Sequence, residues 1–171
     1  FAQGNNHAIK RALETYEDVE YILLINNDTR ITKGMVRTLI ERFESERDIG
    51  IVVPKILFER GAEYFSKDYT EHQKGKVIWY AGGGIDWNNL ILTHKGIDEV
   101  DRGQFDRGIQ SQFETEEEFA TGCCMLTSPS LWKKIRGFDA KYFLYYEDAD
   151  LSMRMIHQLH KKIVVEPNAV L

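Results

Sequence analysis

Three acidic residues within four positions are the most distinctive group in the sequence. Glu147, Asp148 and Asp150 follow an aromatic run at residues 142–146, which reads YFLYY. A sheltered carboxylate can remove a proton from a hydroxyl group and so act as a general base. Apolar residues at helical spacing resume directly after these acids, so we expect a helix to begin near Glu147 or Asp148. The positive end of the helix dipole would stabilise the carboxylates as anions.

The three acids cannot all have the same role. Side chains on a helix turn by about 100° per residue, so Asp148 and Asp150 point about 200° apart. One acid can face a cleft as a base while another caps the helix. A solvated capping cluster is the ordinary interpretation of acids at a helix start. The run at 142–146 favours a cleft, because four aromatic residues in five positions seldom precede an exposed cap.

A second acid follows a predicted buried strand. Residues 21–25 form a continuous apolar run, typical of a parallel strand, and Asn26, Asn27 and Asp28 come directly after it. In open α/β sheets, ligands lie outside the carboxyl ends of the strands. A carboxylate there can hold Mg²⁺ or Mn²⁺, which in turn binds phosphate oxygens, although Asn and Asp also serve as plain turn residues. Together with Asp148, this arrangement suits transfer of a group from a phosphate leaving group to a hydroxyl.

Weaker candidates for ligand binding lie elsewhere in the chain. Residues 4–6 read GNN and could offer Gly4 and Asn6 to a phosphate or sugar at a helix N-terminus, or simply cap a helix. Gly83, inside a triple glycine, could allow a ligand close to the backbone or mark a bend. Trp79 could stack on a sugar ring or pack in the core. The residue types leave each alternative open.

The elements that must position these residues alternate along the chain. The first half should contain a helix from about residue 8, a strand at 21–25, a helix at 35–43 and a strand at 50–54. Three strands should follow, at 77–81, 90–92 and 119–127. The chain should then form a short helix after residue 128, the acid-rich helix and a last strand at 162–165. Such alternation predicts an α/β domain with right-handed crossovers.

Composition limits the class of protein. The 171 residues are 43% hydrophobic, 12% aromatic and 29% charged, as expected of one globular domain that spans the whole chain. The net charge of −5 argues against a nucleic-acid partner, which would require a basic surface. No apolar run approaches the ~18 residues of a membrane span. Cys123 and Cys124 are adjacent in a predicted strand and face opposite sides, so we expect no disulfide between them, which fits the cytoplasm.

Four segments taken in order resemble the inverting family 2 glycosyltransferases of GT-A fold, particularly the bacterial rhamnosyltransferase-like branch. They are residues 1–6 (FAQGNN), 24–29 (LINNDT), 119–126 (FATGCCML) and 137–154 (GFDAKYFLYYEDADLSMR). The second is similar to the family's strand-terminal metal motif in its N-x-D form. The third is similar to its Thr-Gly strand, and the fourth to its Glu-Asp signature. The resemblance covers almost the whole chain.

The resemblance implies a role for each matching residue. Asp28 would bind a divalent cation, Mg²⁺ or Mn²⁺, that bridges the diphosphate of a nucleotide-sugar donor, with Asn26 beside it. Asp148 would be the general base that deprotonates the acceptor hydroxyl, and Glu147 would position the acceptor or the base. Arg154 would be structural, paired with a nearby acid. Gly4, Asn6, Asn26 and Gly122 of the matching segments would contact substrate, and Trp79 and Gly83 are added to them from their residue types alone.

The implied fold is a GT-A type, Rossmann-like α/β domain with a mixed, mostly parallel sheet flanked by helices. The implied activity is transfer of a sugar, with inversion, to a saccharide or lipid-linked acceptor in cell-surface polysaccharide synthesis. It would take place in the cytoplasm, where the resemblance allows peripheral contact with the inner face of the membrane.

The family begins with a strand–helix–strand unit that binds the nucleotide base, and this chain starts after it, at Phe1. A histidine of the metal site often follows the family's Pro-x-Ala-Val stretch, whereas this chain ends at Leu171. We therefore expect a partial catalytic domain that could be inert by itself. Two alternatives are a nucleotidyltransferase that makes sugar nucleotides and a non-catalytic module that binds glycan.

Overall fold

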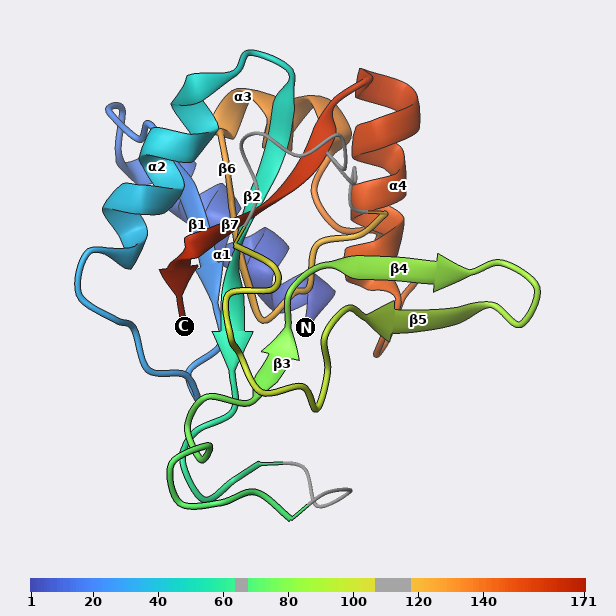
Figure 1. The fold of residues 1–171 in the computed structure, drawn as a ribbon. Helices are drawn as coiled ribbons and strands as arrows, with labels where there is room; N and C mark the ends of the chain where they lie inside the picture. Colours follow the sequence, from blue (N-terminus) through green and yellow to red (C-terminus); the bar gives the residue numbers. More distant parts are fainter. Residues whose placement is uncertain (64–67, 107–117) are drawn as a thin grey trace.

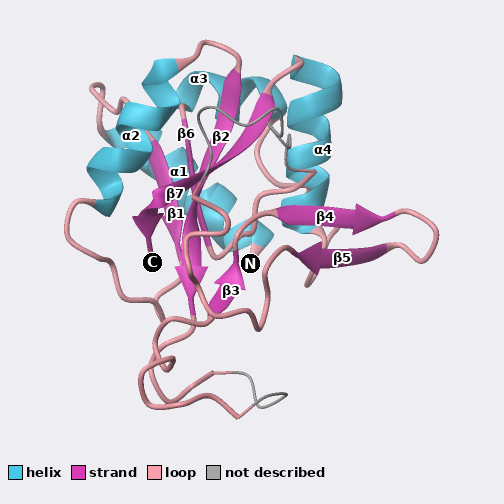
Figure 2. Cartoon of the chain, in the orientation of Figure 1, coloured by secondary structure: helices cyan, strands magenta, loops and turns pink. Residues whose placement is uncertain are grey.

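The computed structural model describes residues 1–63, 68–106 and 118–171. In these ranges the chain forms a mixed five-stranded sheet flanked by helices, and a separate two-stranded hairpin (Figure 1, Figure 2). The helices are α1 (Ala2–Thr15), α2 (Met35–Ser45), α3 (Pro129–Ile135) and α4 (Glu147–Leu159). The strands are β1 (Ile22–Ile25), β2 (Ile49–Leu57), β3 (Ile78–Tyr80), β4 (Gly83–Asp86), β5 (Ile91–His94), β6 (Cys124–Thr127) and β7 (Lys162–Val170).

The sheet is organised around β2, which pairs with β6, β7 and β3. β6 lies between β1 and β2 and runs antiparallel to both, while β7 runs parallel to β2. β3 pairs antiparallel with the last residues of β2. The predicted mixed sheet is confirmed, but a mostly parallel one is not, since only one of these four pairings is parallel. β6 lies between β1 and β2, which run in the same direction, so both of its pairings are antiparallel.

Two strands extend beyond their predicted ends. β2 continues through Pro54 to Leu57, and β7 continues through Pro167 to Val170. The β2–β7 register shifts between Pro54 and Lys55, and such an irregularity tolerates a residue that cannot donate a backbone hydrogen bond. The backbone N–H of Leu57 then donates to the carbonyl oxygen of Leu171 (2.9 Å). Both strands are therefore longer than the predicted ranges 50–54 and 162–165.

The predicted start of the first helix is also wrong, because α1 begins at Ala2 rather than near residue 8. Ala2 and Ile9 are both buried, and the ring of Phe1 packs edge-on against Phe138 with 5.5 Å between centroids. This packing holds the first turn in helical form although the residues there are typical of turns. Tertiary contacts override a weak local preference in this way.

The helices cover the sheet with apolar faces at the predicted spacing. Met35 and Leu39 of α2 are buried, as are Leu151 and Met155 of α4. Each pair is separated by one helical turn, so both side chains of the pair reach the core. Within residues 1–63, 68–106 and 118–171, no helix is both long and apolar enough to cross a lipid bilayer.

The β4–β5 hairpin projects from the body of the protein beside the lower end of α4 (Figure 1). Its turn is held by the Asp86 carboxylate, which accepts hydrogen bonds from the backbone N–H groups of Asn88 and Asn89. Glu118 holds the middle of β4 and the start of the turn, because its carboxylate accepts hydrogen bonds from Ile85 N (2.6 Å) and Trp87 Nε1 (3.0 Å).

Candidate active site

The Asp148 carboxylate is fixed in the first turn of α4. The helix begins at Glu147, as predicted. One carboxylate oxygen of Asp148, Oδ2, accepts a hydrogen bond from the backbone N–H of Gly122 (2.9 Å), and the other, Oδ1, accepts one from Ala149 N (2.8 Å). The side chain thus lies against the segment that leads into β6.

Ser152 attaches the same turn to the same segment. Its hydroxyl donates to the carbonyl oxygen of Asp148 (2.7 Å) and accepts from the backbone N–H of Ala120 (2.9 Å). The side chain is fully buried. A Cβ atom at Gly122 would lie 3.1 Å from the Phe1 ring and 3.5 Å from Asp148 Oδ2, so glycine permits this close approach. Gly122, predicted to contact substrate, therefore supports Asp148 through its backbone.

Asp28 follows a strand end that contacts the same segment. The backbone N–H of Asn26, just after β1, donates to the carbonyl oxygen of Cys123 (2.8 Å). Burial, and after it the nearby charge of Asp28, raises the pKa of the Cys123 thiol to about 11. The Asp28 side chain is exposed and makes no hydrogen bond or ion pair with the part of the chain that the structure describes. The two predicted acid sites thus meet at adjacent residues, Gly122 and Cys123.

The third acid of the cluster has a different environment. Asp150 Oδ2 accepts a hydrogen bond from Arg154 Nε (2.8 Å), one turn along α4. The other guanidinium nitrogens of Arg154 donate to the carbonyl oxygens of Ile135 (2.7 Å) and Gly137 (2.9 Å), at the end of α3. The predicted pairing of Arg154 with a nearby acid is confirmed, and that acid lies on the same helix. Asp150 and Arg154 join two helices, and Asp150 is not available as a base.

Glu147 is the most deeply buried of the three acids, with 7% of its surface exposed. Its Oε2 atom is buried and has no hydrogen-bond partner among the described residues. An unsatisfied buried polar atom costs about 1–3 kcal/mol of stability, which exceeds the roughly 0.3–1 kcal/mol that a carboxylate gains at a helix N-terminus. The hydrogen-bonding capacity of this oxygen is therefore unused among the described residues.

His94 is close enough to Asp148 for the charge of Asp148 to act on its pKa, and sequence reasoning missed it. Its Nδ1 is 3.1 Å from the carbonyl oxygen of Trp79, and because a carbonyl only accepts, Nδ1 carries the hydrogen and Nε2 can accept. Burial lowers the pKa of His94, while the Trp79 carbonyl and the charge of Asp148 act in the opposite direction. The histidine is placed by the pairing of His94 with Gly83 between β4 and β5, which no local pattern could indicate.

Four predicted substrate residues lie away from the two acids or are already in use. Gly4 is exposed in the first turn of α1 with no neighbouring atom within 4 Å of a Cβ position. The Asn6 side chain donates to the carbonyl oxygen of Phe138 (2.8 Å) and accepts from its N–H (3.0 Å), so it joins α1 to the loop before α4. Asn6 is therefore already bound within the protein, whereas Gly4 lies at the N-terminus of α1 and its contact with a ligand stays a prediction.

The other two contribute to the aromatic packing around His94. A Cβ atom at Gly83 would lie 2.3 Å from the Phe119 carbonyl oxygen, so this glycine allows close contact with Phe119 instead of with a ligand. Trp79 is half-buried, and its ring centroid is 4.5 Å from that of His94. Gly83 and Trp79 therefore belong to the packing that holds His94 in place.

The aromatic run at 142–146 does not enclose the acids as predicted. Phe143 is 91% exposed and Tyr145 is 71% exposed. Tyr145 and Tyr146 both have a positive φ, 67° and 66°, so the chain turns sharply into α4 and leaves the preceding side chains at the surface. This is a correction, because these residues were the reason for expecting a closed cleft.

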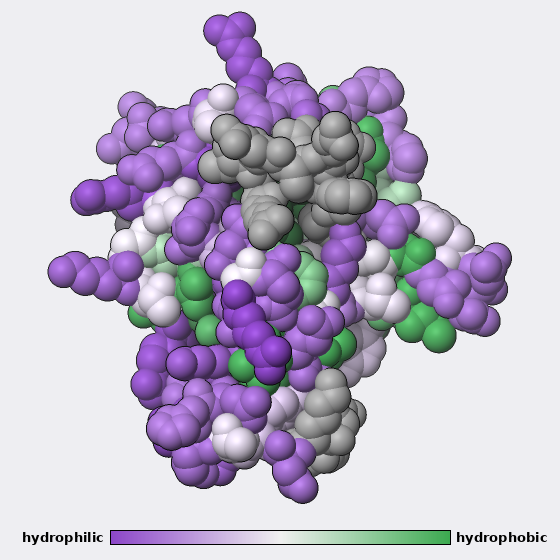
Figure 3. All heavy atoms as spheres, in the orientation of Figure 1, coloured by the Kyte–Doolittle hydropathy of each residue, from purple (hydrophilic) through white to green (hydrophobic). Residues whose placement is uncertain are grey.

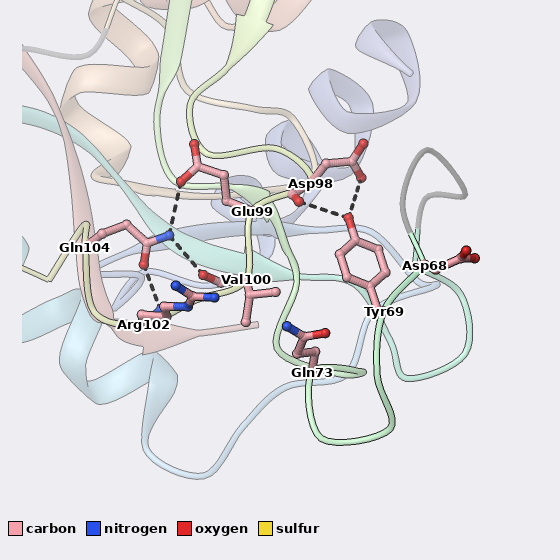
Figure 4. Close-up of a pocket in the computed structure, with 8 residues that line it drawn as sticks. All are labelled: Asp68, Tyr69, Gln73, Asp98, Glu99, Val100, Arg102 and Gln104. Carbon is pink, nitrogen blue, oxygen red and sulfur yellow. Dashed lines mark hydrogen bonds between the residues drawn. The ribbon is translucent and has the colours of Figure 1, made fainter.

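A polar hollow of about 480 Å³ lies between two loops away from both acids (Figure 4). Its walls are hydrogen-bonded internally: the Tyr69 hydroxyl donates to the Asp98 carbonyl oxygen (2.9 Å), and Gln104 Nε2 donates to Glu99 (3.2 Å). The lining contains neither Asp28 nor Asp148. These contacts order the loops, and we assign no ligand to the hollow.

Neither a family model nor a curated protein matches this chain. Within the described ranges, no three His, Cys, Asp or Glu side chains gather in a group that could hold a metal ion.

Proposed function

We propose that the protein is a glycosyltransferase of the GT-A type, which moves a sugar from a nucleotide-diphosphate donor to an acceptor hydroxyl with inversion. The observation that carries the proposal is the meeting of two acids at adjacent residues. Asp148 binds the N–H of Gly122, and the strand end that carries Asp28 binds the carbonyl of Cys123. A fixed carboxylate and a free carboxylate on one segment suit a reaction that needs a base and a charged leaving group.

Asp148 acts as the general base. Its two hydrogen bonds with backbone N–H groups fix the carboxylate, and a carboxylate has further lone pairs that can accept an acceptor hydroxyl. Asp148 takes the proton as the hydroxyl oxygen attacks the anomeric carbon. The bond from that carbon to the diphosphate oxygen breaks, and its electron pair leaves with the nucleoside diphosphate. This is a single in-line displacement, which inverts the anomeric centre.

Asp28 fits a divalent cation that takes most of its ligands from the substrate. Mg²⁺ is usually held by one or two carboxylates together with phosphate oxygens and water, so a single free carboxylate is sufficient. Asn26 lies two positions away, and its side-chain amide makes no hydrogen bond to a described residue. A bound divalent cation would stabilise the negative charge of the departing diphosphate. Asp28 would hold it, with Asn26 as a neutral neighbour.

Glu147 would position the acceptor. Its buried Oε2 has no partner within the described ranges, and it precedes the base by one residue. A hydroxyl that donates to this oxygen would satisfy it and be brought to the start of α4. The same buried oxygen that costs stability would then be used in the complex with acceptor.

Calorimetric titration with UDP and with dTDP, each with and without Mn²⁺, tests the proposal. We expect binding of at least one nucleotide that requires Mn²⁺ and is lost in Asp28→Asn. Asp18→Asn is the matched control, because Asp18 is another exposed acid outside the site. Binding that ignores both Mn²⁺ and Asp28→Asn would overturn the assignment of Asp28. Glycan binding without any nucleotide binding would instead identify a non-catalytic module.

A further inference from the structure

Large apolar side chains are concentrated on one part of the surface. Of twelve exposed large hydrophobic residues in the described ranges, eight lie in two short segments, residues 87–91 of the β4–β5 hairpin and residues 142–146 before α4. The eight are Trp87, Leu90, Ile91, Tyr142, Phe143, Leu144, Tyr145 and Tyr146. Figure 3 shows green, apolar atoms over the hairpin on an otherwise mostly purple face. We call these two segments together the apolar face.

The apolar face contains a hollow. A groove of about 420 Å³ lies between the hairpin and α4, lined by Trp87 and Leu90 on one side and by Met153 on the other. The Tyr146 hydroxyl donates a hydrogen bond to the carbonyl oxygen of Leu90 (3.1 Å), which joins the two segments. A cavity of about 150 Å³ is enough to bind benzene, so the groove has room for an aromatic side chain.

The apolar face also carries a projecting side chain next to this hollow. Phe143 is 91% exposed, the largest fraction among the exposed hydrophobic residues of the described ranges. It follows Tyr142, which lines the groove, but it is not itself part of the lining. In a twofold contact, residue i of one copy meets residue j of the other, and j meets i. A twofold axis between the two features would therefore place the Phe143 of each copy in the groove of the other.

The chemistry of the apolar face allows such a contact. Neither segment contains a charged residue, so two copies can meet here without opposing like charges, although each carries a net charge of −5. Among the described residues that line the groove, Asp150 alone is charged, and it is paired with Arg154. Tyr, Trp and Phe are enriched at the centre of protein interfaces, where Asp, Glu and Lys are depleted. An apolar surface is also complementary to a copy of itself.

We propose that the apolar face binds a second copy of this chain, in a twofold dimer in which the Phe143 of each copy occupies the groove of the other. The available area is sufficient. The exposed parts of the eight side chains amount to roughly 1,000 Å² for residues of this size, and a stable interface takes about 800 Å² from each partner. The inference does not rest on the proposed function, because neither Asp28 nor Asp148 lines the groove.

A lipid bilayer and a different protein explain these features less well. The apolar face contains no Lys or Arg, so it offers no attraction to anionic lipid headgroups. A bilayer would cover Phe143 but does not account for a hollow beside it. A different protein would need a knob and a hollow of its own at matching spacing, whereas a second copy supplies both by symmetry.

Sedimentation equilibrium at increasing protein concentration tests the inference. We expect the wild type to pass from one copy to two as concentration rises. Phe143→Ser should weaken the dimer by about a hundredfold or more, because a twofold interface contains the substitution twice. Tyr16→Ser is the matched control, since it removes an exposed aromatic side chain outside the apolar face and should leave the dimer unchanged.

A second variant tests the exchange of Phe143 between the two copies. Met153→Glu places a charge in the groove and should also weaken the dimer. When Phe143→Ser and Met153→Glu are mixed, the Phe143 of one variant can enter the unaltered groove of the other. The mixture should therefore associate about tenfold or more tightly than either variant by itself. Thermal unfolding verifies that each variant folds, and Leu90→Glu replaces Met153→Glu if the latter does not.

Several results would overturn the inference. They are a wild type that stays monomeric at every concentration, a dimer that Phe143→Ser does not weaken, a mixture that associates no more tightly than its components, and a monomer that binds phosphatidylcholine vesicles through Phe143 instead of dimerising. Nucleotide binding by the wild type is measured in the same samples. A dimer without nucleotide binding supports the interface and counts against the transferase function, whereas a monomer that binds nucleotide does the reverse.

Discussion

Asp28 and Asp148 both lie near one short segment, Gly122 and Cys123, and differ in almost every other respect. Asp148 accepts two backbone hydrogen bonds and sits on a turn that Ser152 attaches to Ala120. Asp28 is exposed and makes no hydrogen bond or ion pair with a described residue. The first carboxylate is held in one position, whereas the second is free to take a ligand.

The difference matches what each proposed role requires. A base must lie within hydrogen-bond reach of the proton that it removes, and a displacement of about 1 Å can cost a hundredfold in rate. A cation ligand can adjust, because the cation and the diphosphate contribute most of the coordination. The proposed base therefore requires a carboxylate held in place, as at Asp148, and the proposed cation ligand requires an unpaired carboxylate, as at Asp28.

The largest expected effect comes from removing the fixed charge. Asp148→Asn should lower turnover by about 10²–10⁴-fold, the usual contribution of a general base. Asp150→Asn makes the same change two positions later. We expect near-normal turnover in this variant, because the Asp150 carboxylate is hydrogen-bonded to Arg154 and is not the base. Steady-state rates of the two variants measure this. Equal losses in both would show that the cluster acts only by holding α4 in place.

Arg154→Met should give the largest loss of stability in this region. It removes a charged donor from two carbonyl oxygens at the end of α3 and leaves Asp150 unpaired. Hydrogen bonds of this type contribute about 1.5–3 kcal/mol, so we expect the free energy of unfolding to fall by about 2–4 kcal/mol. Urea unfolding measures it. A loss below about 0.5 kcal/mol, as for an ordinary surface ion pair, would contradict the assigned role.

Glu147→Met should raise the free energy of unfolding by about 1 kcal/mol while it lowers activity. The variant removes the unpartnered buried oxygen, and that gain exceeds the lost interaction with the helix dipole. Glu147→Gln is the control, since it keeps a polar atom in the same place and should not stabilise. Thermal unfolding of both decides the matter. If Glu147→Met is less stable than the wild type, the oxygen has a partner in the folded protein.

The smallest effect concerns pH and His94. Its pKa in the folded protein lies below the ordinary value of 6.5, so the unfolded chain binds a proton more readily as pH falls past about 6.5. The stability contributed by His94 is complete above that pH and is lost as pH falls toward the folded-state pKa. His94→Gln should therefore lose less stability than the wild type between about pH 7.5 and pH 5.5. Urea unfolding at the two pH values provides the comparison.

The same histidine reports on Asp148. Because the charge of Asp148 opposes the lowering of the His94 pKa, Asp148→Asn should lower that pKa further. Asp150→Asn should leave it unchanged, since Asp150 is paired with Arg154. NMR titration of the imidazole ring follows both variants. No change in Asp148→Asn would contradict the proximity of the two side chains.

Local patterns predicted the parts of this site that depend on local structure. The end of β1 before Asn26 and the start of α4 at Glu147 both follow from apolar spacing, and both are confirmed. Residues positioned by distant contacts were missed or misjudged. Asn6 bonds with Phe138, and His94 is placed by strand pairing, so neither role could be read from its neighbours in the sequence.

The aromatic run at 142–146 was misjudged for a related reason. Its composition predicted burial, yet burial depends on the direction in which the chain enters α4. Two consecutive left-handed residues, Tyr145 and Tyr146, set that direction, and neither is a glycine or asparagine that would have indicated it. Tyr142 and Tyr146 of this run line a groove together with residues of the β4–β5 hairpin, and only the folded chain brings these two segments together.

A donor saturation curve tests the central claim most directly. Nucleoside diphosphate release is measured against nucleotide-sugar and Mn²⁺ concentrations for the wild type, Asp28→Asn and Asp148→Asn. We predict that Asp28→Asn raises the concentrations of donor and Mn²⁺ needed for half-maximal rate, whereas Asp148→Asn lowers the maximal rate and leaves those concentrations nearly unchanged. If the two variants change the same parameter by the same factor, the fixed and the free acid do not have separate roles and the account is wrong.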